Sequence, residues 1–265
     1  MKLVYQYGVA FAISLLSFAA NAQTVTLDYY FNHEFRKSST GAPERFHYIW
    51  EEKDYNGYSV LGDVFKSQGF KLASLEAAPT AANLKSSSVY IIVDPDTRKE
   101  NPTPNFIQPA DVANMEAWVK QGGVLVMFAN DSANAELPHF NTLAAAFGMH
   151  FNNDLQNHVK DDKHFDDGGV IIKGNPVFKT SGKIYMKDAC SITTTGNAKP
   201  VLKNAAGATL IAMAKHGKGS VIAIADPWLY DEYTNGRLPA ELGFENDKAA
   251  HDLVVWIKDL VGRSR

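Results

Sequence analysis

Residues 89–96 read Val-Tyr-Ile-Ile-Val-Asp-Pro-Asp, five apolar residues followed at once by two aspartates and a proline between them. A run that is apolar on both faces is typical of a strand buried between two layers, as in a parallel sheet. A second such run, Val124–Phe128, follows a segment in which Val112, Met115 and Val119 recur at helical spacing. Together the two runs predict a β-α-β unit at the centre of a parallel sheet.

The rest of the chain continues this alternation. Further strands are predicted at 25–31 and 70–75, and helices at 59–68 (capped by Ser59), 109–121, 140–147 and 246–261. A polar loop is predicted over 32–56, and the segments 209–214 and 220–225 predict a β-hairpin around His216-Gly-Lys-Gly219. The pattern as a whole predicts an α/β domain with a doubly wound, mainly parallel sheet and an irregular β-rich insertion near 150–210.

Composition narrows the class of protein. The 265 residues carry 26 Lys and Arg against 29 Asp and Glu, a net charge of −3. Such a balance argues against a nucleic-acid partner, which requires a basic surface. Hydrophobic residues make up 45% and charged residues 21%, which is typical of a globular chain. The single cysteine excludes an intramolecular disulfide and a cysteine-based zinc site.

The first 22 residues predict a cleaved export signal. Lys2 precedes an apolar run over 9–18, and Ala20-Asn-Ala22 provides small residues at the cleavage positions. The apolar run is about half the length of about 20 residues that a membrane-spanning helix needs. We therefore expect a signal peptide at 1–22, a single domain over 23–265, a periplasmic or secreted location, and no membrane contact after cleavage.

Polar residues gather where the predicted strands end, and ligands of open α/β sheets bind beyond those carboxyl ends. Three carboxylates are catalytic candidates: Asp94, Asp131 and Asp226. Six residues are substrate-binding candidates: His33, Glu34, Asp96, Asn130, Trp228 and Tyr230. Carboxylates and amides hydrogen-bond sugar hydroxyls, and aromatic faces pack on sugar rings. The alternative is that the aromatic residues anchor long loops to the core.

The carboxylates of this chain favour one kind of catalytic chemistry over another. A glycosidase uses two carboxylates roughly 5–10 Å apart, and Asp94 or Asp96 with Asp131 or Asp226 would provide such a pair. A nucleophile elbow is not indicated, because neither Gly-x-Ser-x-Gly nor Gly-x-Cys-x-Gly occurs. Cys190 falls in a predicted strand and is expected to be a small core residue.

Metal-binding patterns are also missing from the sequence. The eight histidines form neither His-x-His nor His-Glu-x-x-His. His158 and His164 lie among aspartates that could bind a metal, but a solvated loop is the stronger expectation. Asp94 and Asp96 could contact Ca²⁺, although their loop lacks the EF-hand pattern. No metal and no other cofactor is therefore expected.

Several stretches together resemble the class I glutamine amidotransferase-like domain found beside, or fused to, bacterial unsaturated rhamnogalacturonyl hydrolases. They are residues 27–34 (LDYYFNHE), 45–51, 90–97, 122–126, 130–136 and 219–233. The resemblance covers about Val25 to Val261 and implies a flavodoxin-like fold. It also implies a role in the breakdown of pectin, specifically of rhamnogalacturonan fragments, with an oligosaccharide ligand and a glycoside hydrolase as a partner.

The chain departs from that family's enzymes in two respects. No elbow matches the amidotransferase Cys-His-Glu triad, so glutaminase activity is not expected. The hydrolase itself resembles a helical (α/α) toroid, and this chain has no such helical repeat. Two hypotheses remain for the function: a sugar-recognition or accessory domain without turnover, and a hydrolase that acts on unsaturated rhamnogalacturonan oligosaccharides through paired carboxylates. A structural domain that docks onto an enzyme is a third.

Overall fold

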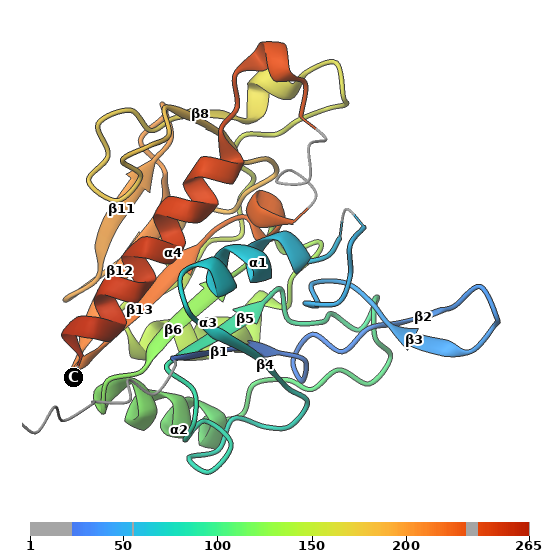
Figure 1. Ribbon diagram of the computed structural model, residues 1–265, viewed down its shortest axis with the longest axis vertical. Coiled ribbons are helices and arrows are strands. Elements are labelled where there is room, and N and C mark those ends of the chain that lie inside the picture. Colours follow the sequence, from blue (N-terminus) through green and yellow to red (C-terminus); the bar gives the residue numbers. More distant parts are fainter. Residues whose placement is uncertain (1–22, 55, 232–237, 265) are drawn as a thin grey trace, which may run out of the picture.

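The computed structural model describes residues 23–54, 56–231 and 238–264, so the predicted export signal lies outside the described residues. A seven-stranded sheet with the order β11-β12-β13-β6-β5-β1-β4 forms the centre (Figure 1). Its strands are β1 (Thr24–Asp28), β4 (Lys71–Leu75), β5 (Val89–Val93), β6 (Val124–Phe128), β11 (Lys199–Lys203), β12 (Thr209–His216) and β13 (Gly219–Ile224). The strands from β13 to β4 are parallel, and the predicted hairpin β12–β13 adds the antiparallel end. The prediction of a mainly parallel α/β sheet is thus confirmed.

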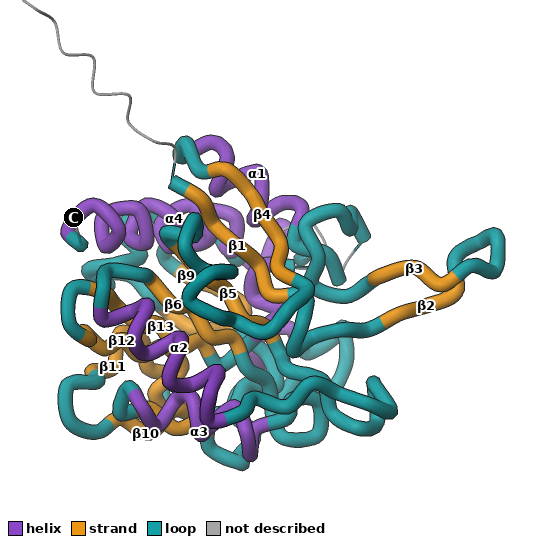
Figure 2. The backbone as a smooth tube through the Cα atoms, turned by 90° about the horizontal axis from the view of Figure 1, so that it is seen from below, coloured by secondary structure: helices purple, strands orange, loops and turns teal. Residues whose placement is uncertain are grey.

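Helices cover both faces of this sheet. α1 (Ser59–Ser67) and α4 (Asn246–Arg263) lie on one face, and α2 (Pro109–Lys120) and α3 (Leu137–Ala146) lie on the other (Figure 2). α2 buries Met115 and Val119, two of the residues that its periodicity assigned to the core. Every residue of β5 and β6 is buried, as their continuous apolar runs predicted.

The chain changes direction between β1 and β5. From β1 it passes through α1 to β4 at one edge of the sheet, and then crosses back to β5 on the other side of β1. The later strands β6 and β13 continue away from β1. The chain thus continues from β1 to α1 on one face of the sheet and from β5 to α2 on the other, and such a point is where open α/β sheets bind ligands.

Three small antiparallel pairs accompany the central sheet. β7 (Met149–Phe151) pairs with β10 (Ile192–Thr194), and β8 (Gly169–Ile171) pairs with β9 (Lys183–Tyr185), which confirms the β-rich insertion. β2 (Phe35–Lys37) and β3 (Pro43–Arg45) form a hairpin that projects from the body (Figure 2), where the sequence predicted only a polar loop. All three β2 residues are exposed, so this hairpin lacks the alternation of buried and exposed residues by which strands are recognised. Short 3-10 turns occupy Phe165–Gly168, Pro227–Tyr230 and Ala240–Leu242.

Several predicted boundaries shift for local reasons. Tyr58, and not Ser59, is the N-cap residue of α1, and no side chain caps that helix. α3 begins at Leu137 instead of 140, because the Glu136 carboxylate accepts a hydrogen bond from the His139 backbone N–H. Cys190 is buried but lies just before β10, outside any strand.

Asn246 joins the last helix to the β-rich insertion. Its Oδ1 accepts from the Tyr185 backbone N–H at 2.8 Å, and its Nδ2 donates to the carbonyls of Tyr185 and Leu229 at 3.0 and 3.1 Å. The side chain is 2% exposed. We predict that Asn246→Ala lowers the free energy of unfolding by about 3 kcal/mol, because three buried backbone groups lose their partner.

Urea denaturation measures this loss. Asp247→Ala is the matched control, because Asp247 is the next residue of the same helix and is exposed. An equal loss in the two variants would contradict the assigned role of Asn246.

Candidate functional site

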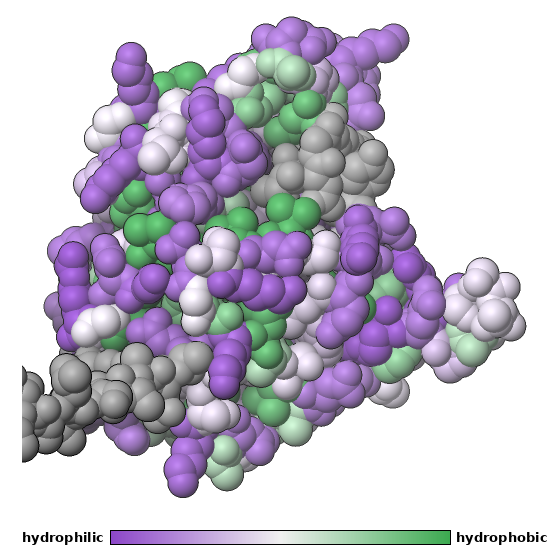
Figure 3. Space-filling model, viewed as in Figure 1, coloured by the Kyte–Doolittle hydropathy of each residue, from purple (hydrophilic) through white to green (hydrophobic). Residues whose placement is uncertain are grey.

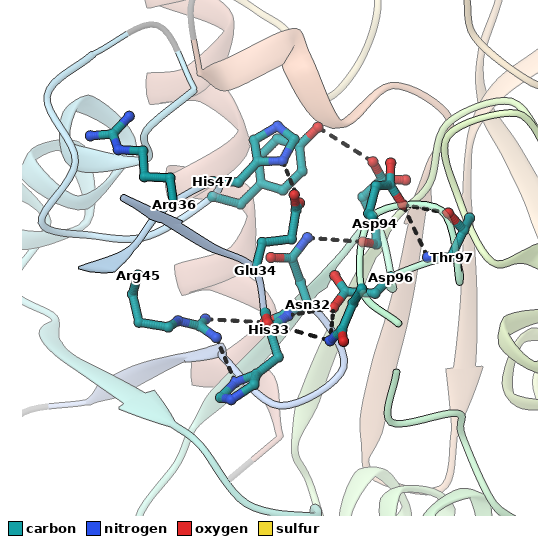
Figure 4. A network of polar contacts seen from close by, with 12 residues as sticks. Asn32, His33, Glu34, Arg36, Arg45, His47, Asp94, Asp96 and Thr97 are labelled. Atoms are coloured by element: carbon teal, nitrogen blue, oxygen red, sulfur yellow. Dashed lines mark hydrogen bonds and ion pairs between the residues drawn. The ribbon is translucent and has the colours of Figure 1, made fainter. Parts of the chain in front are cut away.

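The loops after β1 and β5 meet at the point where the chain changes direction. Asn32 Nδ2 donates to the Asp94 carbonyl at 3.0 Å, and the His33 backbone N–H donates to Asp96 Oδ2 at 3.0 Å (Figure 4). Glu34 follows directly in the same loop. The structure thus brings together four of the predicted site residues: His33, Glu34, Asp94 and Asp96.

A buried carboxyl group at the end of β1 sets the course of the first loop. Asp28 Oδ2 accepts from the backbone N–H groups of Tyr30 and Phe31 at 3.2 and 2.7 Å, and Oδ1 accepts from the Tyr90 hydroxyl of β5 at 2.5 Å. These bonds end β1 at Asp28, three residues earlier than predicted. Burial raises the pKa of Asp28 to about 7, although every one of these hydrogen bonds lowers it.

The two aspartates after β5 are also buried. Burial, with the charges of Glu100 and Glu34, raises the pKa of Asp94 well above its ordinary value. Burial likewise raises the pKa of Asp96 to about 6, against hydrogen bonds from Asn101 and the His33 backbone. Both aspartates therefore hold a proton more tightly than an exposed aspartate does.

Some polar atoms of this cluster have no hydrogen-bond partner among the described residues. They are Asn32 Oδ1, Asp94 Oδ1 and Asp96 Oδ1, all of them buried. An unsatisfied buried acceptor costs about 1–3 kcal/mol. Folded proteins keep such costs mainly where function requires them.

A carboxylate–imidazole pair lies beside these aspartates. His47 Nδ1 donates to Glu34 Oε1 at 2.6 Å (Figure 4), and the His47 ring is stacked on the Tyr48 ring at 4.0 Å. The Glu34 and His47 side chains are 11% and 20% exposed. Nδ1 is thus engaged by Glu34, and Nε2 bonds to no other described residue.

Strained backbone coincides with this cluster. His47, Tyr48 and Asp94 have φ values of 70°, 53° and 42°, in the left-handed region that residues other than glycine seldom adopt. Each such residue costs on the order of 1–3 kcal/mol. The described residues contain only two others of this kind, Asn157 and Asp188. Strain concentrated in three contacting loop residues points to a functional site.

The β2–β3 hairpin adds an arginine to one side of the cluster. The Arg45 guanidinium lies over the Tyr29 ring at 5.0 Å and the Phe35 ring at 5.4 Å. Its Nη2 donates to the Asn32 carbonyl at 3.1 Å, and its Nη1 is 2.5 Å from His33 Nδ1. Arg45 thus fixes the imidazole of His33 and the loop that carries it.

A shallow cavity of about 340 Å³ opens beside this hairpin. The residues that line it are Arg36, Glu44, Arg45, Ile49, Glu51, Glu52, Lys53 and Asp54. Glu52 connects the cavity to the imidazole pair, because it accepts from the His47 backbone N–H at 2.8 Å and from Arg36 at 3.0 Å. Charges of both signs therefore line the approach to the site, which suits a ligand rich in hydroxyl groups.

The residues predicted after β6 form a turn at the same edge. Asn130 is buried, and its Oδ1 accepts from the Asp131 backbone N–H at 2.8 Å. The Asp131 carboxylate accepts from the Ala133 backbone N–H at 2.7 Å and from Asn134 at 3.2 Å. Asp131 is partly exposed, so a role in catalysis stays a prediction for it.

The residues predicted after β13 are held mainly by structural contacts. Asp226 is fully buried, accepts from the backbone N–H groups of Trp228 and Lys187 at 2.8 and 3.0 Å, and has a pKa raised by burial to about 7. Tyr230 is buried with its ring edge against Phe128. Trp228 is partly exposed and packs under the Lys187 ammonium at 4.5 Å. The buried Tyr230 ring thus anchors its loop to the core, which was the alternative to a role in sugar binding.

His47 was not among the residues predicted for the site. The sequence shows it in an aromatic segment, Phe46-His-Tyr-Ile-Trp50, next to a charged loop. Nothing in the sequence marks its pairing with Glu34, which is 13 residues away. The only available signal was the concentration of aromatic and charged residues in one loop.

Three further properties bear on the function. Within the described residues, no helix is long and apolar enough to cross a membrane, and no three His, Cys, Asp or Glu side chains are placed to hold a metal ion. The exposed large apolar side chains in this part of the chain are Phe35, Leu155 and Ile171, on separate segments. On the face shown in Figure 3, apolar residues are interspersed with hydrophilic ones, so this face offers no broad apolar docking patch.

Comparison with known proteins shows the fold and no family. No protein-family model and no curated protein sequence matches the chain. Among solved structures, the mmIFT52 N-terminal domain is 14% identical with a TM-score of 0.66, covering 88% of this chain and 97% of that one. A cytoplasmic protein of Salmonella typhimurium is 12% identical with a TM-score of 0.55, covering 88% and 98%.

A third similar structure belongs to a larger protein. The exo-β-1,4-mannosidase Op5Man5 from Opitutaceae bacterium strain TAV5 is 13% identical with a TM-score of 0.50, and the match covers 88% of this chain but 35% of the mannosidase. At these identities the likeness concerns the fold alone. None of these three proteins is named as an amidotransferase or a rhamnogalacturonyl hydrolase, so the resemblance noted in the sequence stays a prediction.

Asp28 predicts a pH dependence of stability. Its folded-state pKa of about 7 lies above its ordinary value of 3.8, so the folded state binds the proton more tightly. The free energy of unfolding should therefore fall as pH rises from about 4 to about 7, by at most about 4 kcal/mol for three pKa units. We predict that the Asp28→Asn variant does not show this decrease in the free energy of unfolding, because asparagine cannot ionise.

Urea denaturation of both proteins at pH 4.5 and pH 8 tests the prediction. The difference in the free energy of unfolding between variant and parent reports on Asp28, because other titrating groups such as Asp226 contribute equally to both proteins. A difference that stays constant between the two pH values would contradict the raised pKa.

Proposed function

We propose that this protein is an exported, carbohydrate-associated domain that recognises rhamnogalacturonan fragments at the β1–β5 edge and assists a glycoside hydrolase, without amidotransferase activity. The observation that carries the proposal is the polar cluster of Asn32, Glu34, His47, Asp94 and Asp96 at the point where the chain changes direction, with strained backbone at His47 and Asp94. Carboxylates, an amide and an imidazole can hydrogen-bond hydroxyl groups, and a cavity opens beside them at the β2–β3 hairpin.

The arrangement of strands supports the finer description of the fold. We propose that the domain is flavodoxin-like and doubly wound, because the order β4-β1-β5-β6-β13 is a parallel sheet that grows in both directions from β1 and carries helices on both faces. The export signal over 1–22 and a periplasmic or secreted location remain part of the proposal on the sequence evidence.

The state of Cys190 supports a function without a cysteine nucleophile. Burial raises the pKa of its thiol, and the charges of Asp154, Asp94 and Asp131 raise it further. A thiol that is buried and protonated is a poor nucleophile. The amidotransferase reaction needs a reactive thiolate, and the chain has no other cysteine.

The fold of the exo-β-1,4-mannosidase is consistent with an accessory role. In that protein the matching part makes up 35% of a chain named as a glycosidase. We propose by analogy that the present chain also works beside a glycoside hydrolase.

Binding to rhamnogalacturonan oligosaccharides tests the proposal. We predict that Glu34→Gln and His33→Ala each weaken binding roughly tenfold in calorimetric titration, since each removes a hydrogen-bonding group that is charged or close to a charge. Asp63→Asn is the matched control, because Asp63 is a 74% exposed carboxylate on α1. Unchanged affinity in both site variants would refute recognition at this edge.

A second candidate function is hydrolysis of unsaturated rhamnogalacturonan oligosaccharides through paired carboxyl groups. The observation that favours it is the pKa of Asp96, which burial raises to about 6 and the nearby Glu34 carboxylate raises further. A carboxyl group with a raised pKa can serve as a general acid beside a second carboxyl group. Asp226 is a poor test residue here, because its carboxylate holds the turn at Pro227–Tyr230.

Mass spectrometry of the oligosaccharides over time tests this second function. If the protein is a hydrolase, new product masses should appear, and the rate should fall above about pH 6 as Asp96 loses its proton. Asp96→Asn should abolish turnover and retain binding. The control variant, Asp247→Asn on α4, should change neither turnover nor binding. An unchanged mass profile at high protein concentration would refute hydrolysis of these substrates.

A further inference from the structure

A second cavity lies at the opposite end of the strands from the candidate site. It has a volume of about 340 Å³, which is within the range of small-molecule pockets. Its walls come from Ser87 and Ser88 just before β5, Gly122 and Gly123 just before β6, the last turn of α2, and the C-terminal end of α4. The end of α4 marks this edge of the sheet in Figure 1.

Five polar side chains that line this cavity make no hydrogen bond to another described residue. They are Lys85, Ser88, Asn114, Trp118 and Gln121. All five are partly or fully exposed. Hydrogen-bond donors and acceptors that converge on one cavity without internal partners are characteristic of a ligand site.

Trp118 has a fixed orientation in this cavity. A Cβ atom at Gly123 would be 2.5 Å from the indole ring, so the ring lies directly on the backbone of that glycine. The ring edge also packs against Tyr90, with centroids 6.5 Å apart and planes at 85°. A partly exposed indole held in this way offers a stacking surface for the C–H face of a sugar ring.

The charge in the lining of the cavity favours an anion. Lys85 is among the described residues that line it, and no carboxylate is. A lining with a lysine and no carboxylate favours an acidic ligand.

We propose that this cavity binds the uronate unit of an acidic saccharide. The carboxylate meets the Lys85 ammonium, one face of the sugar ring stacks on Trp118, and the hydroxyl groups bond to Ser88, Asn114 and Gln121. This site is additional to the one in the proposed function, with which it shares a class of ligand but no residue.

Calorimetry and tryptophan fluorescence with galacturonate, at low salt, test the assignment. Lys85→Ala should weaken binding roughly tenfold, as expected for loss of a charged hydrogen bond. Trp118→Phe should also weaken binding and remove the fluorescence change on titration. Lys173→Ala, which removes an exposed lysine in the β-rich insertion, should have no effect. Added salt should weaken galacturonate binding, because it screens the charges.

The other outcomes overturn the proposal in distinguishable ways. Equal binding of galactose and galacturonate would refute an acidic ligand, and no binding at millimolar galacturonate would refute the site. Binding that Glu34→Gln weakens and Lys85→Ala leaves unchanged would place the uronate at the β1–β5 edge, which refutes the second site and retains the proposed function. Loss in Lys85→Ala alone, with rhamnogalacturonan binding unaffected by Glu34→Gln and His33→Ala, would retain the second site and refute the first.

Discussion

The buried carboxyl group of Asp28 joins the two strands from which the candidate site is built. One of its oxygens accepts from the Tyr90 hydroxyl on β5, and the other accepts from the backbone at the start of the loop after β1. The loop can therefore turn sharply toward Asp94 and Asp96 instead of extending the strand. The hydrogen bonds that hold His33 and Asn32 against β5 all depend on that turn.

The same edge concentrates features that are unfavourable for folding. Buried carboxyl groups with raised pKa values, acceptors without partners and left-handed residues all occur within a few side chains of Asp94. The continuous apolar strands β5 and β6 and the helices on both faces of the sheet supply the stability that offsets these costs. The candidate site thus lies where the unfavourable contributions to folding are concentrated.

Sequence reasoning was most accurate where one physical cause dominates. β5 and β6 were predicted to the residue, because a strand buried on both faces must be apolar throughout. The β2–β3 hairpin was missed, because its residues are exposed and charged and its strands are only three residues long. Neither hydrophobic periodicity nor a buried face could have revealed it.

For the candidate site, the loops were predictable and the pairings were not. The rule that polar residues gather beyond parallel strands predicted that His33, Glu34, Asp94 and Asp96 lie at one edge of the sheet, and the structure brings them together there. The same rule could not show that the Asp226 carboxylate would hold a turn. It also could not show that His47, from a separate loop, would bond to Glu34. Those outcomes depend on backbone conformations at His47 and Tyr48 that sequence preferences disfavour.

The polarity of the parallel sheet has a consequence for how ligands would be arranged. Every parallel strand begins at one edge of the sheet and ends at the other, and α2, with 12 residues, spans about 18 Å on the way back. The two proposed ligand sites lie at opposite edges, so a short oligosaccharide would not reach both. A long polysaccharide, or two separate chains, can. The domain would then act as a tether whose avidity grows with the length of the polymer.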